Sequence, residues 1–258
     1  MVRGVIRALR AVTAWVPQTD AEERASAAVH GIGAALAAAG LVHLVSRAAD
    51  TGSALAVGAC AIYGLAAFAT LLASALFHGA PRGFDRDEWQ ALEAATPRRV
   101  ALPFRDRELR RARRARRRQL WLAVDHCAIF AMIAGTYTPI LLLAFPQPLG
   151  GVLAAVEWGL ALLGIGVRLA TGRLHWTMIP VFLAMGWLGF FWGDAISAGL
   201  GPAGAAWLLA GGVTYTAGLL FYLWRSLPFN HALWHAFVVG GAVCHYAVMV
   251  VYVLPGDA

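Results

Sequence analysis

The chain has 258 residues, of which 60 % are apolar and 14 % are charged, and its formal net charge is +7. This composition, with a mean hydropathy of +0.64, excludes an ordinary soluble globular domain and favours an integral membrane protein. The positive charge comes from arginine alone and gathers beside apolar segments. Anionic lipid headgroups are therefore the expected partner, and nucleic acid is not.

Residues 1–26 are expected to form a cytoplasmic tail ahead of a single transmembrane domain at 27–258. Arg3, Arg7 and Arg10 recur at helical spacing among apolar residues. The tail is therefore either a short helix that lies on the membrane surface or a solvated segment. No apolar core with a small-residue cleavage site follows these arginines, so a secretory signal is not expected.

Seven apolar segments follow the tail, each long enough for a helix that crosses a bilayer. A lipid-exposed backbone must satisfy its own hydrogen bonds, and a helix does so. The segments lie near residues 27–46, 53–78, 120–143, 150–170, 176–195, 204–224 and 230–253. The fifth and sixth are the least sharply divided, by a glycine-rich turn that ends at Pro202. The sequence therefore predicts an all-α bundle of seven transmembrane helices.

The arginines set the orientation of this bundle. With seven crossings, every arginine except Arg47 falls on the side of the N-terminal tail. Because arginine in short loops collects in the cytoplasm, we expect a cytoplasmic N-terminus and an external C-terminus. In a bacterium, the protein would lie in the inner (plasma) membrane.

The loop 79–119 is the one sizeable polar segment, and it contains the run RRARRARRR at 110–118. This run either extends the third segment as a cationic helix along lipid headgroups or forms a solvated stretch that keeps the loop inside.

Polar residues inside the apolar segments meet at one expected depth. Ser74 and His78 end the second segment in the sequence SALFH, and Asp125 lies near the start of the third. His231 and His235 lie in the first turns of the seventh. All of these positions fall on the side that the arginines mark as cytoplasmic.

These residues can form a metal site. His231 and His235, four residues apart, present two imidazoles on one helical face, as helical zinc sites do. His78 can supply a third, and three histidines with one water complete a tetrahedral zinc centre that has an open position. Zinc lowers the pKa of bound water to about 7. Asp125 can then serve as a general base, while Ser74 orients the water or a substrate carbonyl.

Structural interpretations stay open for the same residues. A histidine in a transmembrane helix is often a packed, hydrogen-bonded side chain, and Asp125 could form a structural hydrogen bond or act as a fourth metal ligand. A charged residue in the membrane costs about 2.5–3.5 kcal/mol on insertion scales, which makes function the default hypothesis. Iron or copper could bind the same imidazoles.

The remaining histidines are weaker candidates. His245 lies about 21 Å from His231 by helical rise, too far to share a metal, and is expected to make a structural contact. His30 either lies beside the site and supports a metal ligand, or has a structural role. His126 points about 100° away from Asp125 on an ideal helix, so it is not expected to be a ligand. A proton or cation pathway along Asp125, His126 and His245 is a weaker alternative function.

Four stretches resemble the hemolysin III family, the bacterial branch of the progestin and adipoQ receptor family. They are EERASAAVHGIG (22–33), SALFH (74–78), DHCAIFAMIAGTYTP (125–139) and HALWHAFVVGGAVCH (231–245). The resemblance implies a seven-helix protein whose cytoplasmic-side zinc is bound by His78, His231 and His235, with Asp125 and Ser74 beside it. The loop 79–119 is longer and richer in arginine than is usual for this family, and Ser26 stands where such sequences often have asparagine.

Two functions follow from this combination. The wider family resembles the alkaline ceramidases at its site, which implies a zinc-dependent hydrolase of lipid amide or ester bonds. The alternative is a non-catalytic receptor, lipid sensor or pore-forming protein in which zinc is structural. Neither the substrate nor the oligomeric state follows from the sequence.

Overall fold

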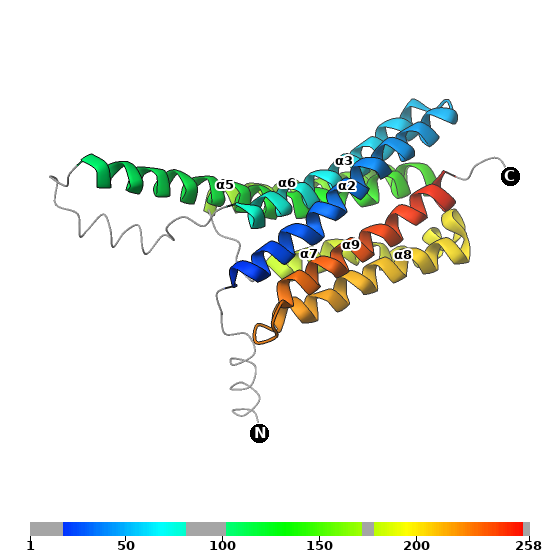
Figure 1. The fold of residues 1–258 in the computed structure, drawn as a ribbon. Helices are drawn as coiled ribbons and strands as arrows, with labels where there is room; N and C mark the ends of the chain where they lie inside the picture. Colours follow the sequence, from blue (N-terminus) through cyan, green and yellow to red (C-terminus); the bar gives the residue numbers. More distant parts are fainter. Residues whose placement is uncertain (1–17, 81–101, 172–177, 255–258) are drawn as a thin grey trace, which may run out of the picture.

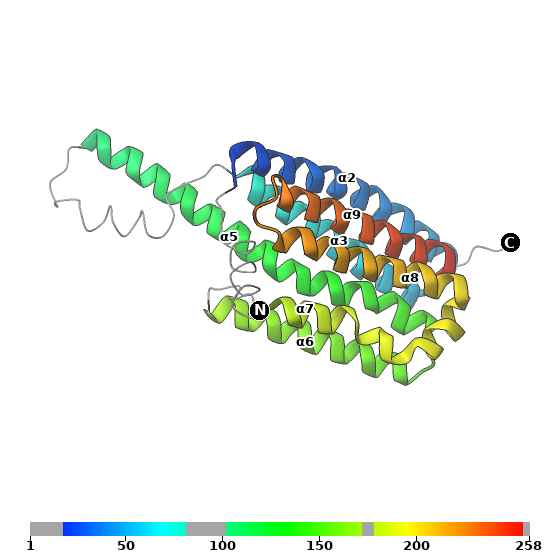
Figure 2. The ribbon, with the colours of Figure 1, turned by 90° about the horizontal axis from the view of Figure 1, so that it is seen from below.

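The computed structural model describes residues 18–80, 102–171 and 178–254, and within these ranges every regular element is helical. Figures 1 and 2 show a bundle of long helices packed side by side. The helices are α2 (Asp20–Asp50), α3 (Ala54–Gly79), α5 (Leu102–Pro139), α6 (Leu149–Thr171), α7 (Met178–Gly186), α8 (Gly193–Leu223) and α9 (Asn230–Val248). Two π turns, Ile140–Ala144 and Met249–Val253, continue α5 and α9, and a 3-10 helix, Leu188–Trp192, follows α7. The predicted all-α class is confirmed.

Six helical runs in the described residues are long and apolar enough to cross a membrane. The predicted fifth and sixth segments fall in one of them, the 46-residue run Met178–Leu223. This run is interrupted at Gly201, whose φ of +70° is not helical, and Pro202 follows. Figures 1 and 2 show that the chain turns back between α7 and the later part of α8. Length and composition alone support six spans, so seven crossings and their orientation stay predictions.

The order of packing brings distant parts of the chain to one end of the bundle. Helix α2 packs against α3 and α9, α9 packs against α8, and α5 packs against α3 and α6. Figure 1 shows the start of α2, the end of α3 and the start of α9 together at that end. The termini of these three helices therefore lie close to one another.

Glutamate and asparagine side chains hold the helix ends in this arrangement. At the start of α2, the Thr19 side chain accepts from the Glu22 backbone, and the Glu22 carboxylate accepts from Thr19 N at 2.7 Å, which is a capping box. Glu22 also accepts from Phe229 N at 2.8 Å, so it joins the start of α9 to α2. Asn230 Nδ2 donates to Phe221 O, one of the last carbonyls of α8.

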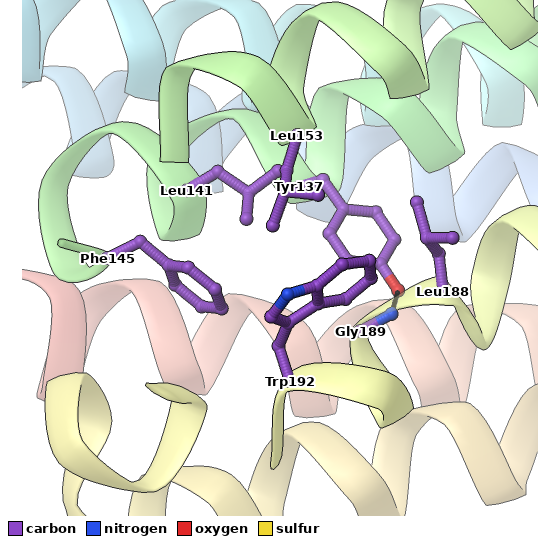
Figure 3. A pocket seen from close by; sticks show the side chains of 7 residues that line it. All are labelled: Tyr137, Leu141, Phe145, Leu153, Leu188, Gly189 and Trp192. Atoms are coloured by element: carbon purple, nitrogen blue, oxygen red, sulfur yellow. Dashed lines mark hydrogen bonds between the residues drawn. The ribbon is translucent and has the colours of Figure 1, made fainter. Parts of the chain in front are cut away.

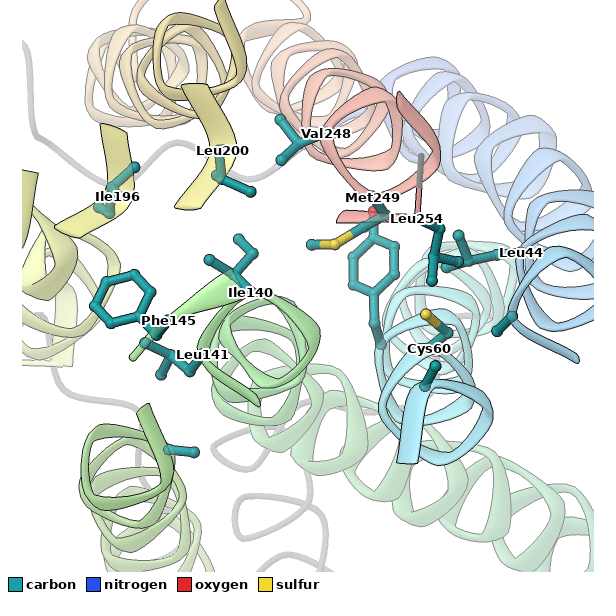
Figure 4. Close-up of a cluster of buried hydrophobic side chains, with 14 of the residues drawn as sticks. Leu44, Cys60, Ile140, Leu141, Phe145, Ile196, Leu200, Val248, Met249 and Leu254 are labelled. Atoms are coloured by element: carbon teal, nitrogen blue, oxygen red, sulfur yellow. The ribbon is translucent and has the colours of Figure 1, made fainter. Parts of the chain in front are cut away.

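The largest hydrophobic cluster lies toward the other end of the bundle. Figure 4 shows side chains from α2, α3, α9 and the two π turns meeting there, among them Leu44, Cys60, Ile140 and Met249. These four are 1 % exposed or less. This core fixes the helices whose opposite ends carry the polar residues.

Helix α5 begins at Leu102, so the arginine-rich run extends the third segment as a helix, whereas its contact with lipid headgroups stays a prediction. Figures 1 and 2 show its N-terminal part projecting beyond the bundle. Most described arginines of the run are exposed: Arg110, Arg111, Arg113, Arg114, Arg116 and Arg117. The rest of the predicted loop, 81–101, and residues 1–17 of the predicted tail lie outside the described residues.

The contact between α5 and α6 depends on one glycine. A β-carbon at Gly164 would overlap the ring of Phe130, which is fully buried, whereas a β-carbon at Gly166 would meet no atom within 4 Å. We expect Gly164→Ala to destabilise the fold by about 1–3 kcal/mol, because a packed core resists added volume. Thermal unfolding in detergent should show a lower midpoint for Gly164→Ala and an equal or slightly higher one for Gly166→Ala, since alanine is the better helix former. Equal midpoints for the two variants would contradict this account of the contact.

Candidate metal site

Three imidazoles from two helices meet at the end of the bundle described above. His78 lies in the last turn of α3, and His231 and His235 lie in the first two turns of α9. His78 Nε2 is 3.2 Å from His231 Nε2 and 3.1 Å from His235 Nε2. One ring nitrogen from each of the three lies within 4.8 Å of the others. The structure therefore brings together the three histidines that the sequence pattern predicts as candidate metal ligands.

This spacing fits a tetrahedral metal. Two nitrogens bound to zinc at about 2.0–2.1 Å are roughly 3.3 Å apart in a tetrahedral site. A neutral His78 that donates from Nδ1 has a single lone pair on Nε2, yet two other ring nitrogens approach that atom. A cation among the three nitrogens would satisfy all of them. The donor set suits zinc, iron or copper, and it does not distinguish among them.

Glu23 orients one of these candidate ligands. His78 Nδ1 donates to Glu23 Oε2 at 2.7 Å, and both side chains are largely buried. This bond fixes the tautomer that leaves Nε2 available to a metal, as carboxylates commonly do for metal-binding histidines. The other Glu23 oxygen accepts from Arg118 at 2.6 Å. This role of Glu23 does not follow from the sequence patterns used above, although its place in the EERASAAVHGIG stretch, at the expected depth of the site, is a signal for it.

Ser74 and Asp125 lie beside the histidines without joining them. Ser74 is buried on α3, one turn before His78, and its Oγ makes no regular hydrogen bond within the described part of the chain. The Asp125 carboxyl on α5 lies near the Ser74 hydroxyl and the His78 ring. Within residues 18–80, 102–171 and 178–254, the group that could hold a metal has only the three histidines as members.

Known proteins resemble this chain over most of its length. The family described as "Haemolysin-III related" matches residues 110–246. Hemolysin-3 of Bacillus cereus is 35% identical over 235 residues, which cover 91% of this chain and 93% of that protein. The chain belongs to the hemolysin III family. The Hemolysin-3 homolog of Bacillus subtilis is 34% identical over 91% of this chain and 95% of its own length.

The chain also has a more distant similarity to mammalian proteins called monocyte to macrophage differentiation factor. The human monocyte to macrophage differentiation factor is 28% identical over 133 residues, which cover 48% of this chain and 54% of that protein. The predicted family is thus confirmed. Membership of the hemolysin III family and the six apolar helical runs make this a multi-pass membrane protein, which in bacteria lies in the inner membrane.

The other histidines that the sequence singled out lie outside the cluster. The His30 ring packs against the His235 ring with centroids 3.7 Å apart. His126 Nδ1 accepts from Arg168 Nε at 3.3 Å. His245 Nε2 donates to Leu208 O at 3.2 Å. His126 and His245 thus have separate partners on α6 and α8, which supports structural roles for both rather than a shared pathway.

A small apolar pocket lies away from the histidines. Figure 3 shows Tyr137, Phe145 and Trp192 pointing toward one another around it. The Tyr137 hydroxyl accepts a hydrogen bond from Gly189 N. Tyr137 follows Asp125 by 12 residues of helix, about 18 Å of rise. This pocket is therefore separate from the candidate metal site.

Proposed function

We propose that this member of the hemolysin III family is a zinc-dependent hydrolase of lipid amide or ester bonds, with its site at the cytoplasmic side of the membrane. The convergence of three histidine nitrogens, with no fourth ligand among the described residues, carries the proposal. Catalytic zinc sites have three protein ligands and an open position, whereas structural sites are usually closed by four. The arrangement suits the first kind.

Each polar side chain has a distinct role in this proposal. His78, His231 and His235 hold the metal, which when bound would polarise a carbonyl and make water reactive near neutral pH. Asp125 accepts the proton of the attacking water as general base. The Ser74 hydroxyl is buried and has no hydrogen-bond partner of good geometry among the described residues. In this proposal it hydrogen-bonds to the water or to the substrate carbonyl. A carboxylate retained at this depth is costly, which favours a catalytic role for Asp125.

The surroundings favour a lipid as the substrate. The site lies at the end of helices whose outer faces are apolar, so an acyl chain can remain in the bilayer while its amide or ester reaches the metal. The exposed arginines of α5 lie on the same helix as Asp125. In this proposal they bind anionic headgroups beside the site, since each basic side chain near such a surface contributes about 1 kcal/mol.

The burial of the histidines supports a second candidate. His78 and His235 are 5 % and 4 % exposed. A metal enclosed in this way also suits a receptor, a lipid sensor or a pore-forming protein in which zinc only joins α3 to α9.

Reconstitution into liposomes tests the two candidates together. We expect the zinc-loaded protein to release fatty acid from at least one member of a panel of fluorescent lipid amides and esters. Chelation with 1,10-phenanthroline should stop this release, and added zinc should restore it. Leakage of an encapsulated dye without lipid cleavage would favour the pore-forming protein. The absence of both from zinc-loaded protein would favour a receptor or sensor.

A further inference from the structure

Arg118 differs from the other described arginines of its run. The six described arginines before it are exposed, whereas the Arg118 side chain is only 17% exposed and turns back toward the bundle. Its NH2 group donates to Glu23 Oε1 at 2.6 Å. Glu23 Oε2 accepts from His78 Nδ1 at 2.7 Å. A continuous chain of charge-assisted bonds therefore runs from the cationic helix to a candidate metal ligand.

A second contact fixes the same guanidinium. Arg118 lies over the ring of Phe77, with its Cζ 4.6 Å from the ring centroid, and Phe77 immediately precedes His78 on α3. A planar guanidinium can stack on an aromatic face while it hydrogen-bonds to a carboxylate, which an ammonium group does less well. Arg118 is thus held by both α2 and α3 next to the ligand.

His78 is the ligand on which this support is concentrated. Nδ1 of His231 and Nδ1 of His235 are buried and have no hydrogen-bond partner in the described part of the chain. The carboxylate that orients the outer nitrogen of a metal-bound histidine typically affects metal affinity 10–100-fold. The orientation of the site therefore depends strongly on how firmly Glu23 is held.

Helix α5 carries both Arg118 and Asp125. They are seven residues apart, which places them on the same helical face, two turns from each other. One face of α5 thus holds the orienting carboxylate of α2 at Arg118 and presents the acid beside Ser74 and His78 at Asp125. The register of α5 against α2 and α3 positions both groups at once.

We propose that Arg118 is a positioning residue of the metal site that acts through Glu23. The guanidinium holds the Glu23 carboxylate in the orientation that accepts from His78 Nδ1, which keeps His78 Nε2 directed at the metal. Without Arg118, the carboxylate loses the charge-assisted bond at Oε1 and is oriented less firmly toward His78. This inference rests on the metal of the proposed function and is independent of whether a lipid is hydrolysed.

Zinc affinity measures this role directly. Competition with a chromogenic chelator on the detergent-purified full chain should show that Glu23→Gln weakens zinc binding by up to about 100-fold and that Arg118→Ala weakens it by a smaller factor, about 10-fold. Arg118→Lys should recover part of the loss, because it keeps the charge but not the planar stacking on Phe77. The neighbouring Arg117→Ala is the matched control, since Arg117 is exposed, and its zinc affinity should equal that of the wild type.

A double-mutant cycle with Glu23→Gln separates action through Glu23 from a general effect on the fold. If Arg118 acts through Glu23, Arg118→Ala should weaken zinc binding little further in the Glu23→Gln background. A full additional loss in that background would overturn the proposal, as would wild-type affinity in Arg118→Ala. If Arg118→Ala fails to fold, Arg118→Lys and Glu23→Gln still decide the matter, since wild-type affinity in both would overturn it. Wild-type protein that binds no zinc would overturn this inference and the metal site together.

Discussion

Wild-type protein purified in detergent without chelator should contain about one zinc ion per chain, and the His231→Ala/His235→Ala variant should contain almost none. The double substitution removes two of three ligands, and the single imidazole of His78 that remains cannot hold the metal against detergent washing. Metal content by mass spectrometry, normalised to protein concentration, measures the effect. It also identifies the metal, which the histidines alone do not specify.

His245→Ala is the matched control for this experiment. His245 lies on the same helix, α9, but donates to the Leu208 carbonyl and takes no part in the cluster. Its removal should leave the zinc content unchanged, even if the variant unfolds at a lower temperature. Stoichiometric metal retained in the double variant would refute the proposed ligands. No metal in the wild type would leave the histidines as packing groups and would refute both the zinc hydrolase and a structural zinc, so that only a receptor or pore-forming protein without a metal would stand.

The proximity of the three candidate ligands could be predicted from their spacing and their expected depth in the membrane. His231 and His235 share a helical face by their spacing alone, and the arginine distribution placed the end of the second segment at the same depth as the start of the seventh. The expected common depth was then enough to predict His78 as the third candidate ligand. The structure brings these three residues together through the packing of α3, α2 and α9.

The support of the site could not be predicted in the same way. Glu23 and His78 are 55 residues apart, and the bond between them depends on how α2 packs against α3. Arg118 belongs to a run for which the sequence leaves both a cationic helix and a solvated stretch open, and composition does not distinguish Arg118 from its exposed neighbours. Arg118 differs because its guanidinium contacts Glu23 and Phe77, and these tertiary contacts do not follow from local sequence.

Segment boundaries show a similar limit. Hydropathy located the apolar stretches well, but it did not show that α5 continues as a helix through its arginines to Leu102. Charged residues lower the hydropathy without opposing a helix, because arginine is a good helix former. Between the predicted fifth and sixth segments, Gly201 and Pro202 mark the interruption, although both lie inside one long helical run.

Once a substrate has been found in the lipid panel, Asp125→Asn should lower its turnover by about 10²–10⁴-fold while zinc stays bound. A general base contributes rate enhancement of this size, and the asparagine amide has nearly the same shape but cannot accept the proton. Because the described metal group consists of the three histidines, the substitution should not lower zinc content. Single-turnover rates of fatty acid release, measured beside metal content, separate the two effects.

Glu157→Gln makes the same chemical change at another carboxyl inside the membrane. Glu157 is fully buried on α6. It lies 11 residues before Arg168 on the same helix, which is about 17 Å of helical rise. Arg168 donates to His126, the neighbour of Asp125, so Glu157 lies far along α6 from the level of Asp125. Its turnover should match that of the wild type, which would show that loss of a buried carboxyl does not by itself impair the enzyme. Full turnover in Asp125→Asn would make the assignment of the base wrong. Loss of zinc together with turnover would instead make Asp125 a metal ligand, and because a site closed by four protein ligands has no open position, that result would favour the structural zinc of the second candidate.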